Sequence, residues 1–441
     1  MSTDVIFQPL RLGSLTLKNR VLRSSLAGRF DNYDGSGTPV RINWDLKFAR
    51  GGVGAIISSN APVHRRGRLV PGFALIDRDD RIPFFRKLGE RVHEYDCKYI
   101  VQLNHAGRHR DIGDLEFPKG LSSTDRPEPI HGFECERMTL PQIEETVDAF
   151  AQGARRAREA GLDGVEVAGG NGVLVTQFLS SAINDRDDEY GGSLENRARF
   201  ALQIVRAIRA QVGRDFYVGF KISVDECMNE VFPWLRRGNT PAESVQICRW
   251  LEEAGVDAIH ITAGAAFPHP RNPPGTMPVQ DFVATYDTMA ASGRYTFRNY
   301  VAFRTWPFSS VFRWQWERPV RRRGAEGINL PESRAVKEAV SIPVLCGGGF
   351  QTASVVANAI TSGACDGVTI ARSLLANPNL VELWAQGHDR PPRPCTYVNK
   401  CLANFLENPL GCYDESRFDS REQMLEELLS IYREPALPDD A

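Results

Sequence analysis

Long apolar runs are missing from this sequence of 441 residues, since none approaches the roughly 20 residues needed to span a bilayer. An excess of charge is missing too. The 53 basic and 55 acidic side chains leave a formal net charge of −2, which gives no general attraction to nucleic acid or to an anionic membrane. The N-terminal residues lack the basic and then apolar pattern of a signal peptide. These absences predict a cytoplasmic protein that acts on a small molecule.

Cysteine is sparse and scattered. Of the nine cysteines, only the last three, Cys395, Cys401 and Cys412, lie near one another. Because the chain shows no signal peptide, disulfide bonds are not expected, and grouped cysteines indicate a metal site instead. A G-x-G-x-x-G motif after a strand is also missing, so no dinucleotide-binding domain is predicted within the chain.

A repeated pattern of strand and helix runs through most of the sequence. Eight short apolar runs each precede a polar or glycine-rich turn, and helical patterns alternate with them. The runs are Val21–Ser25, Gly54–Ser59, Tyr99–Leu103, Gly164–Val167, Tyr217–Ile222, Ala258–Ile261, Pro343–Cys346 and Gly367–Ile370. This alternation predicts an α/β protein with a (β/α)₈ TIM barrel, in which the chemistry lies at the carboxyl ends of the strands.

One stretch, Gly164–Phe200, reads as a buried strand, a functional loop and a helix for which Ser193 is the expected N-cap. Its second half, NDRDDEYGGSLENRARF, resembles the signature of the Old Yellow Enzyme family of FMN oxidoreductases, in the branch of the NADH:flavin oxidoreductases and 2,4-dienoyl-CoA reductases. The segments FQPLRLGSLTLKNR, VQLNHAGR and 342–378 resemble the same family. The resemblance implies an FMN-binding barrel over residues 1–390, with NAD(P)H as co-substrate.

The resemblance also implies where the flavin ring binds. After the first strand, Ser24, Ser25, Leu26 and Ala27 are expected to pack on the ring. Asn60 and Gln102 are expected to contact it at the ends of the next two strands. The Gln102 amide matches the donor and acceptor edge of the flavin pyrimidine. The alternative is a polar residue at a strand end that bonds only to backbone.

Lys221 ends the fifth strand, where a cation stabilises the negative charge of reduced flavin. The alternative is a lysine that reaches solvent. Phosphate is expected at the last two strand ends, because glycines let backbone N–H groups approach it and an arginine binds it bidentately. The predicted phosphate residues are Gly348, Gly349, Ala371 and Arg372.

The fourth strand departs from the family pattern of two polar residues followed by tyrosine, because Ala168, Asn171 and Val173 stand at those positions. Asn171 can hold a substrate oxygen, but Val173 cannot donate a proton, and general acid help is worth roughly 10²–10⁴-fold in rate. His269 is the expected replacement acid, with Tyr286 and Tyr300 as alternatives; the segment around His269 equally fits a surface loop. For His105, in the NHAGR motif, structural support and substrate contact both stay open.

The sixth strand is followed by the long segment 265–329, which is rich in aromatic residues. Long loops of this kind are functional or disordered, and aromatics this dense need burial. The segment therefore predicts a helical lid over a bulky or apolar substrate. Four arginines follow, Arg318, Arg321, Arg322 and Arg323, which fit a solvated turn or a site for an anionic tail or membrane surface.

The C-terminal extension, residues 391–441, holds the three grouped cysteines. Related iron–sulfur proteins carry four cysteines here, and Val398 occupies the second position. A cluster with another fourth ligand, a three-iron cluster and three free thiols all remain open.

Taken together, these patterns predict an FMN-dependent, NAD(P)H-linked reductase of an activated C=C bond. Because no second nucleotide domain is predicted, hydride is expected from NAD(P)H directly, or electrons from a redox partner protein. A homo-oligomer is expected. The alternatives are an FMN-dependent dehydrogenase of an amine, alcohol or saturated ring that passes electrons through an iron–sulfur centre, and a non-catalytic FMN-binding barrel.

Overall fold

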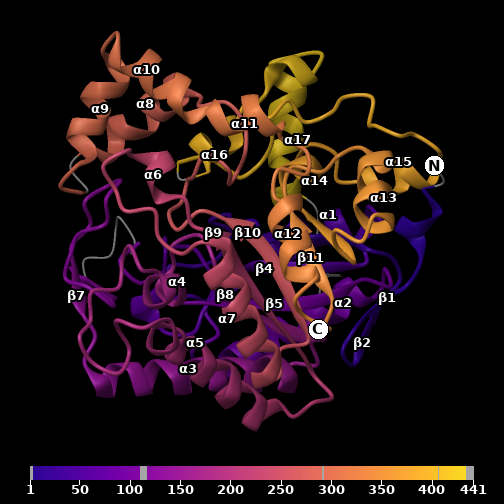
Figure 1. Ribbon diagram of the computed structural model, residues 1–441. Helices are drawn as coiled ribbons and strands as arrows, with labels where there is room; N and C mark the ends of the chain where they lie inside the picture. The colour runs from indigo at the N-terminus through magenta and orange to yellow at the C-terminus, as the bar shows by residue number, and fades with distance from the viewer. Residues whose placement is uncertain (1–2, 110–116, 291–292, 406, 434–441) are drawn as a thin grey trace.

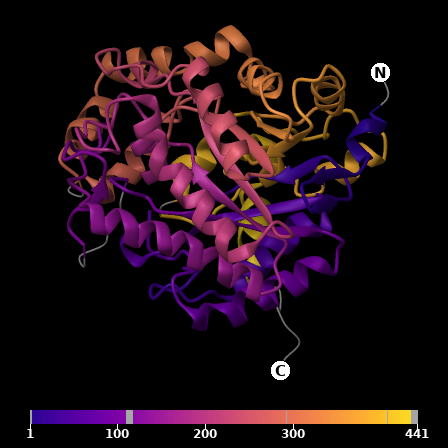
Figure 2. The same ribbon diagram turned by 60° about the horizontal axis from the view of Figure 1, so that its bottom comes forward.

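The computed structural model describes residues 3–109, 117–290, 293–405 and 407–433, with the backbone alone for residues 285–289. A closed barrel of eight parallel strands forms its centre, and helices cover the outside of the barrel (Figure 1, Figure 2). The strands, in chain order, are β3 (Val21–Arg23), β4 (Ala55–Pro62), β5 (Lys98–Asn104), β8 (Gly164–Gly169), β9 (Tyr217–Asp225), β10 (Ala258–Ala263), β11 (Val344–Gly347) and β12 (Gly367–Ile370). Each overlaps one of the eight apolar runs, so the predicted TIM barrel is confirmed.

The barrel closes where β12 pairs in parallel with β3, with Val368 beside Val21. The outer helices in chain order are α1 (Pro39–Arg50), α2 (Ile82–His93), α3 (Leu140–Glu159), α5 (Leu194–Val212), α7 (Pro241–Ala254), α12 (Leu330–Lys337), α13 (Ala353–Thr361), α14 (Arg372–Ala376) and α15 (Leu380–Ala385). Local capping explains where several begin. The Ser193 side chain accepts from the Asn196 amide at the start of α5, as predicted, and α3 and α7 begin with capping boxes at Thr139 and Thr240.

A hairpin covers the amino end of the barrel. Its antiparallel strands, β1 (Leu10–Leu12) and β2 (Leu15–Leu17), turn alternate leucines inward, and these join one buried cluster with Leu22, Ile57 and Leu345 of the barrel strands. Since this end is filled by apolar side chains, space for a ligand is left at the carboxyl ends of the strands.

Four helices follow β10: α8 (Val279–Met289), α9 (Thr296–Arg304), α10 (Phe308–Trp316) and α11 (Arg318–Arg323), at the top of Figure 1. They have a small core of their own, built on Met277, Val279, Phe303 and Trp316. The expectation that all aromatics of this segment are buried is wrong, because several of them face solvent.

The remaining elements connect these parts. They are β6 (Gly120–Ser122), β7 (Cys135–Arg137), α4 (Leu174–Leu179), α6 (Met228–Val231), α16 (Lys400–Asn404) and α17 (Arg421–Arg433), with short 3₁₀ turns at Asp4–Phe7, Arg65–Gly67, Asp79–Arg81 and Glu415–Arg417. The last helix returns to the barrel, where the Asn43 side chain of α1 donates to the Ile431 carbonyl at 2.8 Å. None of the helices in the described part of the chain combines the length and apolar content that a membrane span needs.

Candidate functional site

Two adjoining cavities lie at the carboxyl ends of the barrel strands. The larger, of about 180 Å³, and the smaller, of about 60 Å³, share Ser24, Lys221, Ala371 and Arg372 in their walls. The structure brings together all the residues predicted to contact the flavin or its phosphate. Ser24, Ser25, Leu26, Ala27, Asn60, Gln102, Lys221, Ala371 and Arg372 line the larger cavity, and Gly348 and Gly349 line the smaller one.

A buried chain of hydrogen bonds crosses the barrel and joins the walls of the two cavities. The Gln102 amide donates to Glu166 Oε1 at 2.7 Å, and Glu166 Oε2 lies 2.9 Å from His260 Nδ1. On the other side of the ring, His260 Nε2 lies 2.7 Å from Thr369 Oγ1. Burial lowers the pKa of His260, so the ring is neutral, donates from Nδ1 to Glu166 and accepts from Thr369. One N–H of the Gln102 amide is bound by Glu166, and no partner of its carbonyl oxygen is found among the described residues, so Gln102 can offer that oxygen to the cavity.

Lys221 lines both cavities and interacts electrostatically with Glu166 of this chain. Burial lowers the pKa of Lys221, while the neighbouring Glu166 carboxylate acts in the opposite direction. Although burial alone would raise the pKa of Glu166, the attraction of His260 and Lys221 and the Gln102 hydrogen bond lower it. Glu166 is therefore ionised and balances the lysine charge, which is the condition for a charged lysine at a site where it is only 7% exposed. Solvent exposure of Lys221, the alternative raised above, is ruled out.

The smaller cavity combines glycine backbone with an arginine. Gly349 has φ +71°, and a Cβ there would lie 2.3 Å from the Ala325 carbonyl oxygen, so the close approach requires glycine. The Arg372 guanidinium donates to Asn399 Oδ1 and lies 5.3 Å from the centre of the Tyr397 ring. These two contacts hold the arginine in the cavity wall, with its remaining N–H groups available to an anion.

The wall of the smaller cavity also contains a buried hydrogen-bond acceptor, the side-chain oxygen of Asn329. Asn329 donates its NH₂ to the Gly347 carbonyl at 2.8 Å, while its side-chain oxygen is buried with no hydrogen-bond partner among the described residues. An unsatisfied buried acceptor costs roughly 1–3 kcal/mol, and a ligand hydroxyl would satisfy it.

Asn171 and Val173 lie at the other end of the larger cavity, on the loop after β8. Asn272 donates to Asn171 Oδ1 at 2.6 Å, which leaves the Asn171 NH₂ group for a ligand oxygen. His109 lies beside this loop, since a Cβ on Gly172 would come within 2.9 Å of His109 Nε2. That nitrogen is buried with no partner among the described residues, and burial lowers the pKa of His109 to about 4, so the ring is neutral near pH 7.

His269 does not line these cavities, and the expectation that it supplies a proton is corrected. Its Nδ1 accepts from the Arg271 amide at 3.1 Å, and its Nε2 donates to the Cys227 carbonyl at 3.1 Å. With both nitrogens bound to backbone in a fully buried ring, His269 holds the loop after β10 in place. Of the alternatives, Tyr300 packs against the core of the α8–α10 segment, and the side chain of Tyr286 lies outside the described residues.

His105 is also structural. Its Nδ1 accepts from the Gly107 amide at 3.1 Å, and its ring fills the space beside Gly67, so it supports the cavity wall without lining it. The residues that sequence reasoning missed are Glu166, His260, His109, Asn272 and Asn329. Glu166 and His260 each interrupt an apolar strand with a polar residue, which is a signal that could have been read.

The three grouped cysteines line one small cavity, yet their donor set does not fit a metal cluster. Arg417 donates to Cys412 Sγ at 3.0 Å, so this sulfur already has a partner within the chain. Burial raises the pKa of Cys401 to about 12 and raises that of Cys412 as well. Among the described residues, no group of three or more His, Cys, Asp or Glu side chains is arranged to hold a metal ion. The structure therefore does not support the expected metal site at Cys395, Cys401 and Cys412.

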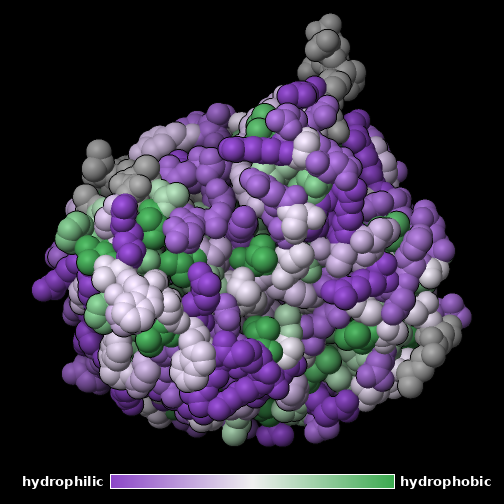
Figure 3. Space-filling view, turned by 90° about the horizontal axis from the view of Figure 1, so that it is seen from above, coloured by the Kyte–Doolittle hydropathy of each residue, from purple (hydrophilic) through white to green (hydrophobic). Residues whose placement is uncertain are grey.

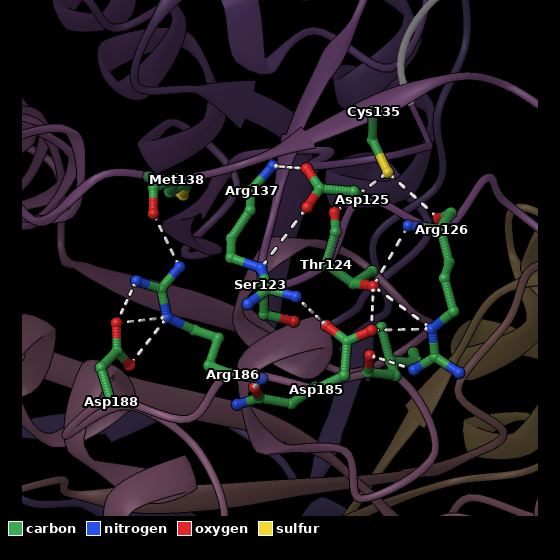
Figure 4. Close-up of polar contacts among 12 residues, drawn as sticks. Ser123, Thr124, Asp125, Arg126, Cys135, Arg137, Met138, Asp185, Arg186 and Asp188 are labelled. Carbon is green, nitrogen blue, oxygen red and sulfur yellow. Dashed lines mark hydrogen bonds and ion pairs between the residues drawn. The ribbon is translucent and has the colours of Figure 1, made fainter.

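Residues 184–200, which resemble the family signature, have a structural role after β8. Asp185 accepts from Thr124 at 2.9 Å and from Arg137 at 3.0 Å (Figure 4). Arg186 donates to the Met138 carbonyl at 2.7 Å and forms an ion pair with Asp188 (Figure 4). None of these side chains lines the cavities, so the stretch ties the loop after β8 to the β6–β7 segment.

A third, larger and mainly apolar cavity of about 680 Å³ lies under α9 and α10. Its wall shares Leu69, His109, Phe267, Leu402 and Phe405 with the larger of the two cavities at the strand ends. An apolar molecule in the third cavity would therefore reach Asn171 and Val173 past His109.

The chain is similar to known flavin oxidoreductases. A family model described as NADH:flavin oxidoreductase / NADH oxidase matches residues 5–290, and one described as dihydrouridine synthase matches residues 318–429. An NADH oxidase from Thermoanaerobacter brockii is 31% identical over 425 residues, which covers 93% of this chain and 57% of the relative. An NADPH dehydrogenase from Halalkalibacterium halodurans is 34% identical over 267 residues, which covers 60% of this chain and 75% of the relative.

Among solved structures, a 2-naphthoyl-CoA reductase matches with a TM-score of 0.72 at 23% identity, over 92% of this chain and 59% of that chain. This likeness shows the fold. The chain spans about half the length of several curated relatives that it matches over most of its own length, with coverages of 57%, 51% and 53% of those proteins.

Proposed function

The chain belongs to the NADH:flavin oxidoreductase / NADH oxidase family, and from this premise we propose that it is an FMN-dependent oxidoreductase that uses NAD(P)H to reduce an activated C=C bond of a bulky, apolar substrate. The observation that carries the proposal is the pair of adjoining cavities. One offers a buried ammonium and an amide oxygen, and the other offers glycine backbone and an arginine.

The residues present fit FMN. Gln102 offers a carbonyl oxygen that matches the N3–H group of the pyrimidine, and Lys221 offers a cation for its carbonyl edge. The orphaned Asn329 oxygen matches a ribityl hydroxyl, and Gly348, Gly349 and Arg372 suit the phosphate. When bound, FMN supplies hydride transfer between NAD(P)H and the substrate.

The chain's own residues then bind and orient the substrate. The free NH₂ group of Asn171 donates to the substrate's carbonyl oxygen, and the His109 ring, neutral and facing the same loop, supplies a second donor from Nε2. Two donors at the oxygen favour the negative charge that develops there as the double bond is reduced. The apolar cavity holds the rest of the substrate and excludes water.

The first experiment identifies the chromophore released by denaturing the purified protein. FMN is expected at about one equivalent per chain; a colourless protein that does not take up added FMN would overturn the proposal.

A second experiment tests the proton supply. Val173→Tyr restores a phenol where the family has one, so reoxidation of the NAD(P)H-reduced enzyme by an enone should accelerate, by up to about 10²-fold in stopped-flow measurements. Val173→Phe is the matched control, since it has nearly the same size without the hydroxyl, and it should give no gain. Equal rates for the two variants would argue against the proposed placement of the substrate.

The alternative of a dehydrogenase that passes electrons through an iron–sulfur centre has no support from the arrangement of the cysteines among the described residues. A homo-oligomeric state, a separate redox partner and a cytoplasmic location stay predictions, to be tested by sedimentation, reductase titration and cell fractionation.

A further inference from the structure

Several large apolar side chains around α9 and α10 face solvent. This aromatic face consists of Trp234, Phe297, Val301, Trp306, Phe308, Val311 and Trp314. Trp306 is 79% exposed, Trp234 is 75% exposed and Trp314 is 63% exposed. Figure 3 looks onto this side of the molecule and shows green and white atoms gathered on its left, over the region where α8–α10 lie. Exposed apolar patches of this kind mark interaction sites.

The aromatic face surrounds the opening of the large apolar cavity. Trp234, Phe308 and Val311 line that cavity, and each of them is also more than half exposed. On α10, Phe312 and Trp316 turn inward to the segment's core while Phe308, Val311 and Trp314 turn outward. The helix therefore presents apolar side chains to the interior and to the surroundings at once.

Positive charge surrounds the same face. Residues 294–323 contain eight arginines and a single glutamate, although the whole chain has a formal net charge of −2. Arg313, Arg318 and Arg322 are exposed, and no ion pair to them is found among the described residues. Helices that lie in the headgroup region of a bilayer combine tryptophan and phenylalanine with arginine. The aromatic rings enter the acyl boundary, and the arginines bind anionic lipid headgroups.

We propose that the aromatic face, together with the exposed arginines beside it on α10 and α11, docks on the surface of an anionic phospholipid bilayer, which places the opening of the apolar cavity against the membrane. Docking itself does not depend on the proposed function. The consequence that an apolar substrate enters the cavity from the membrane does rest on it.

A bilayer fits this surface better than a second copy of the chain does. In a two-fold symmetric dimer the same patch meets itself, so two arginine clusters would be brought together and repel each other. An anionic membrane instead attracts the arginines while it takes up the aromatic rings.

The test is flotation of the full-length, flavin-loaded protein with vesicles of phosphatidylcholine alone or mixed with phosphatidylserine. Binding is expected only to the mixed vesicles and should weaken with salt. Each arginine near an anionic surface contributes about fivefold to partitioning, so Arg318→Glu with Arg322→Glu should lower it by at least about 30-fold. Trp306→Ser with Trp314→Ser should lower it by about tenfold or more.

The matched controls lie elsewhere on the surface. Arg214→Glu changes an exposed arginine away from the aromatic face, and Leu425→Ser changes an exposed leucine of α17; both should bind vesicles like the unaltered protein. Because none of the substituted residues lines a cavity, NAD(P)H oxidation with a water-soluble enone should be unchanged in every variant, which separates docking from catalysis.

Three results would overturn the proposal. The first is failure of the unaltered protein to float with anionic vesicles, and the second is equal binding of neutral and anionic vesicles. The third is a concentration-dependent dimer that the Trp306 and Trp314 variants abolish in a protein that ignores vesicles, which would assign the face to a second copy.

Discussion

The barrel rim and the α8–α11 segment differ in how their positive charges are paired: those of the rim are balanced by a carboxylate, and, among the described residues, several of those in the segment are not. At the rim, the charge of Lys221 is balanced by an ionised Glu166, and Gln102 and His260 bind the two oxygens of that carboxylate. In the segment, arginines outnumber acidic residues, and several of them carry no ion pair within the described chain. The difference teaches that charge at the rim is neutralised within the buried site, whereas the positive charge of the segment is left on the surface beside apolar side chains.

The largest expected effect is acid destabilisation of the rim. Burial lowers the pKa of His105 to about 3 and those of His109 and His269 to about 4. Since these values lie below the ordinary 6.5, the unfolded chain binds protons first. The stability that these histidines contribute is therefore complete above about pH 6.5 and is lost as the pH falls towards 4, by up to about 3 kcal/mol for each histidine.

Urea unfolding at several pH values, for the unaltered protein and a His269→Gln variant, measures this loss. The buried Glu226 acts with the opposite sign, because burial raises its pKa to about 7 and its contribution falls as the pH rises through that value. The difference between the two proteins isolates the histidine. Parallel curves of stability against pH for the unaltered protein and the variant would contradict the predicted contribution of His269. Residues 276–323 contain no histidine, so acid should destabilise the rim before the α8–α11 segment.

Next in size is the loss of phosphate binding. Arg372→Ala removes a buried guanidinium from the smaller cavity, and charge-assisted hydrogen bonds are worth roughly 1.5–3 kcal/mol. We expect FMN to bind about 100-fold more weakly, measured by quenching of its fluorescence. Arg393→Ala, which removes an exposed arginine paired with Asp419, is the control. Unchanged FMN affinity of the Arg372 variant would place the phosphate elsewhere.

A smaller effect is expected at the junction of the two regions. His109→Ala removes a donor from the proposed substrate oxygen, so reoxidation of the reduced enzyme by an enone should slow by about 10–100-fold while FMN affinity stays the same. His109→Gln keeps a neutral donor and should recover part of the rate. A rate unaffected by either change would leave Asn171 as the substrate's contact.

The smallest expected effect is on the KM for a bulky substrate, from a substitution within the α8–α11 segment. Phe312 lines the apolar cavity and packs 5.1 Å from Phe303, measured between ring centres. Phe312→Leu should raise the KM for a bulky enone by about tenfold, the lower end of what one methylene group in an apolar pocket is worth. The KM for a small enone and the FMN content should stay unchanged. If FMN were lost as well, the two regions would not be separable.

Much of the rim was predictable because each strand and the turn after it can be recognised from a short stretch of sequence. Apolar runs followed by turns gave the eight strands, and the carboxyl ends of parallel strands meet at one edge, so Ser24, Gln102, Lys221 and Arg372 had to converge. The aromatic segment was predicted as a helical lid because aromatics this dense need burial; the helices are present, but several of the aromatics face solvent.

The sequence by itself determined the barrel, the ring of polar residues at its rim and the concentration of arginines after the sixth strand. Only the tertiary structure decided that His109 faces the cavity, that His269 turns to the Cys227 carbonyl and that Arg417 donates to the Cys412 thiol. The reason is physical. Strand and helix patterns follow from spacing along the chain, whereas the direction of a loop side chain depends on packing against residues distant in sequence, as when Gly172 meets His109.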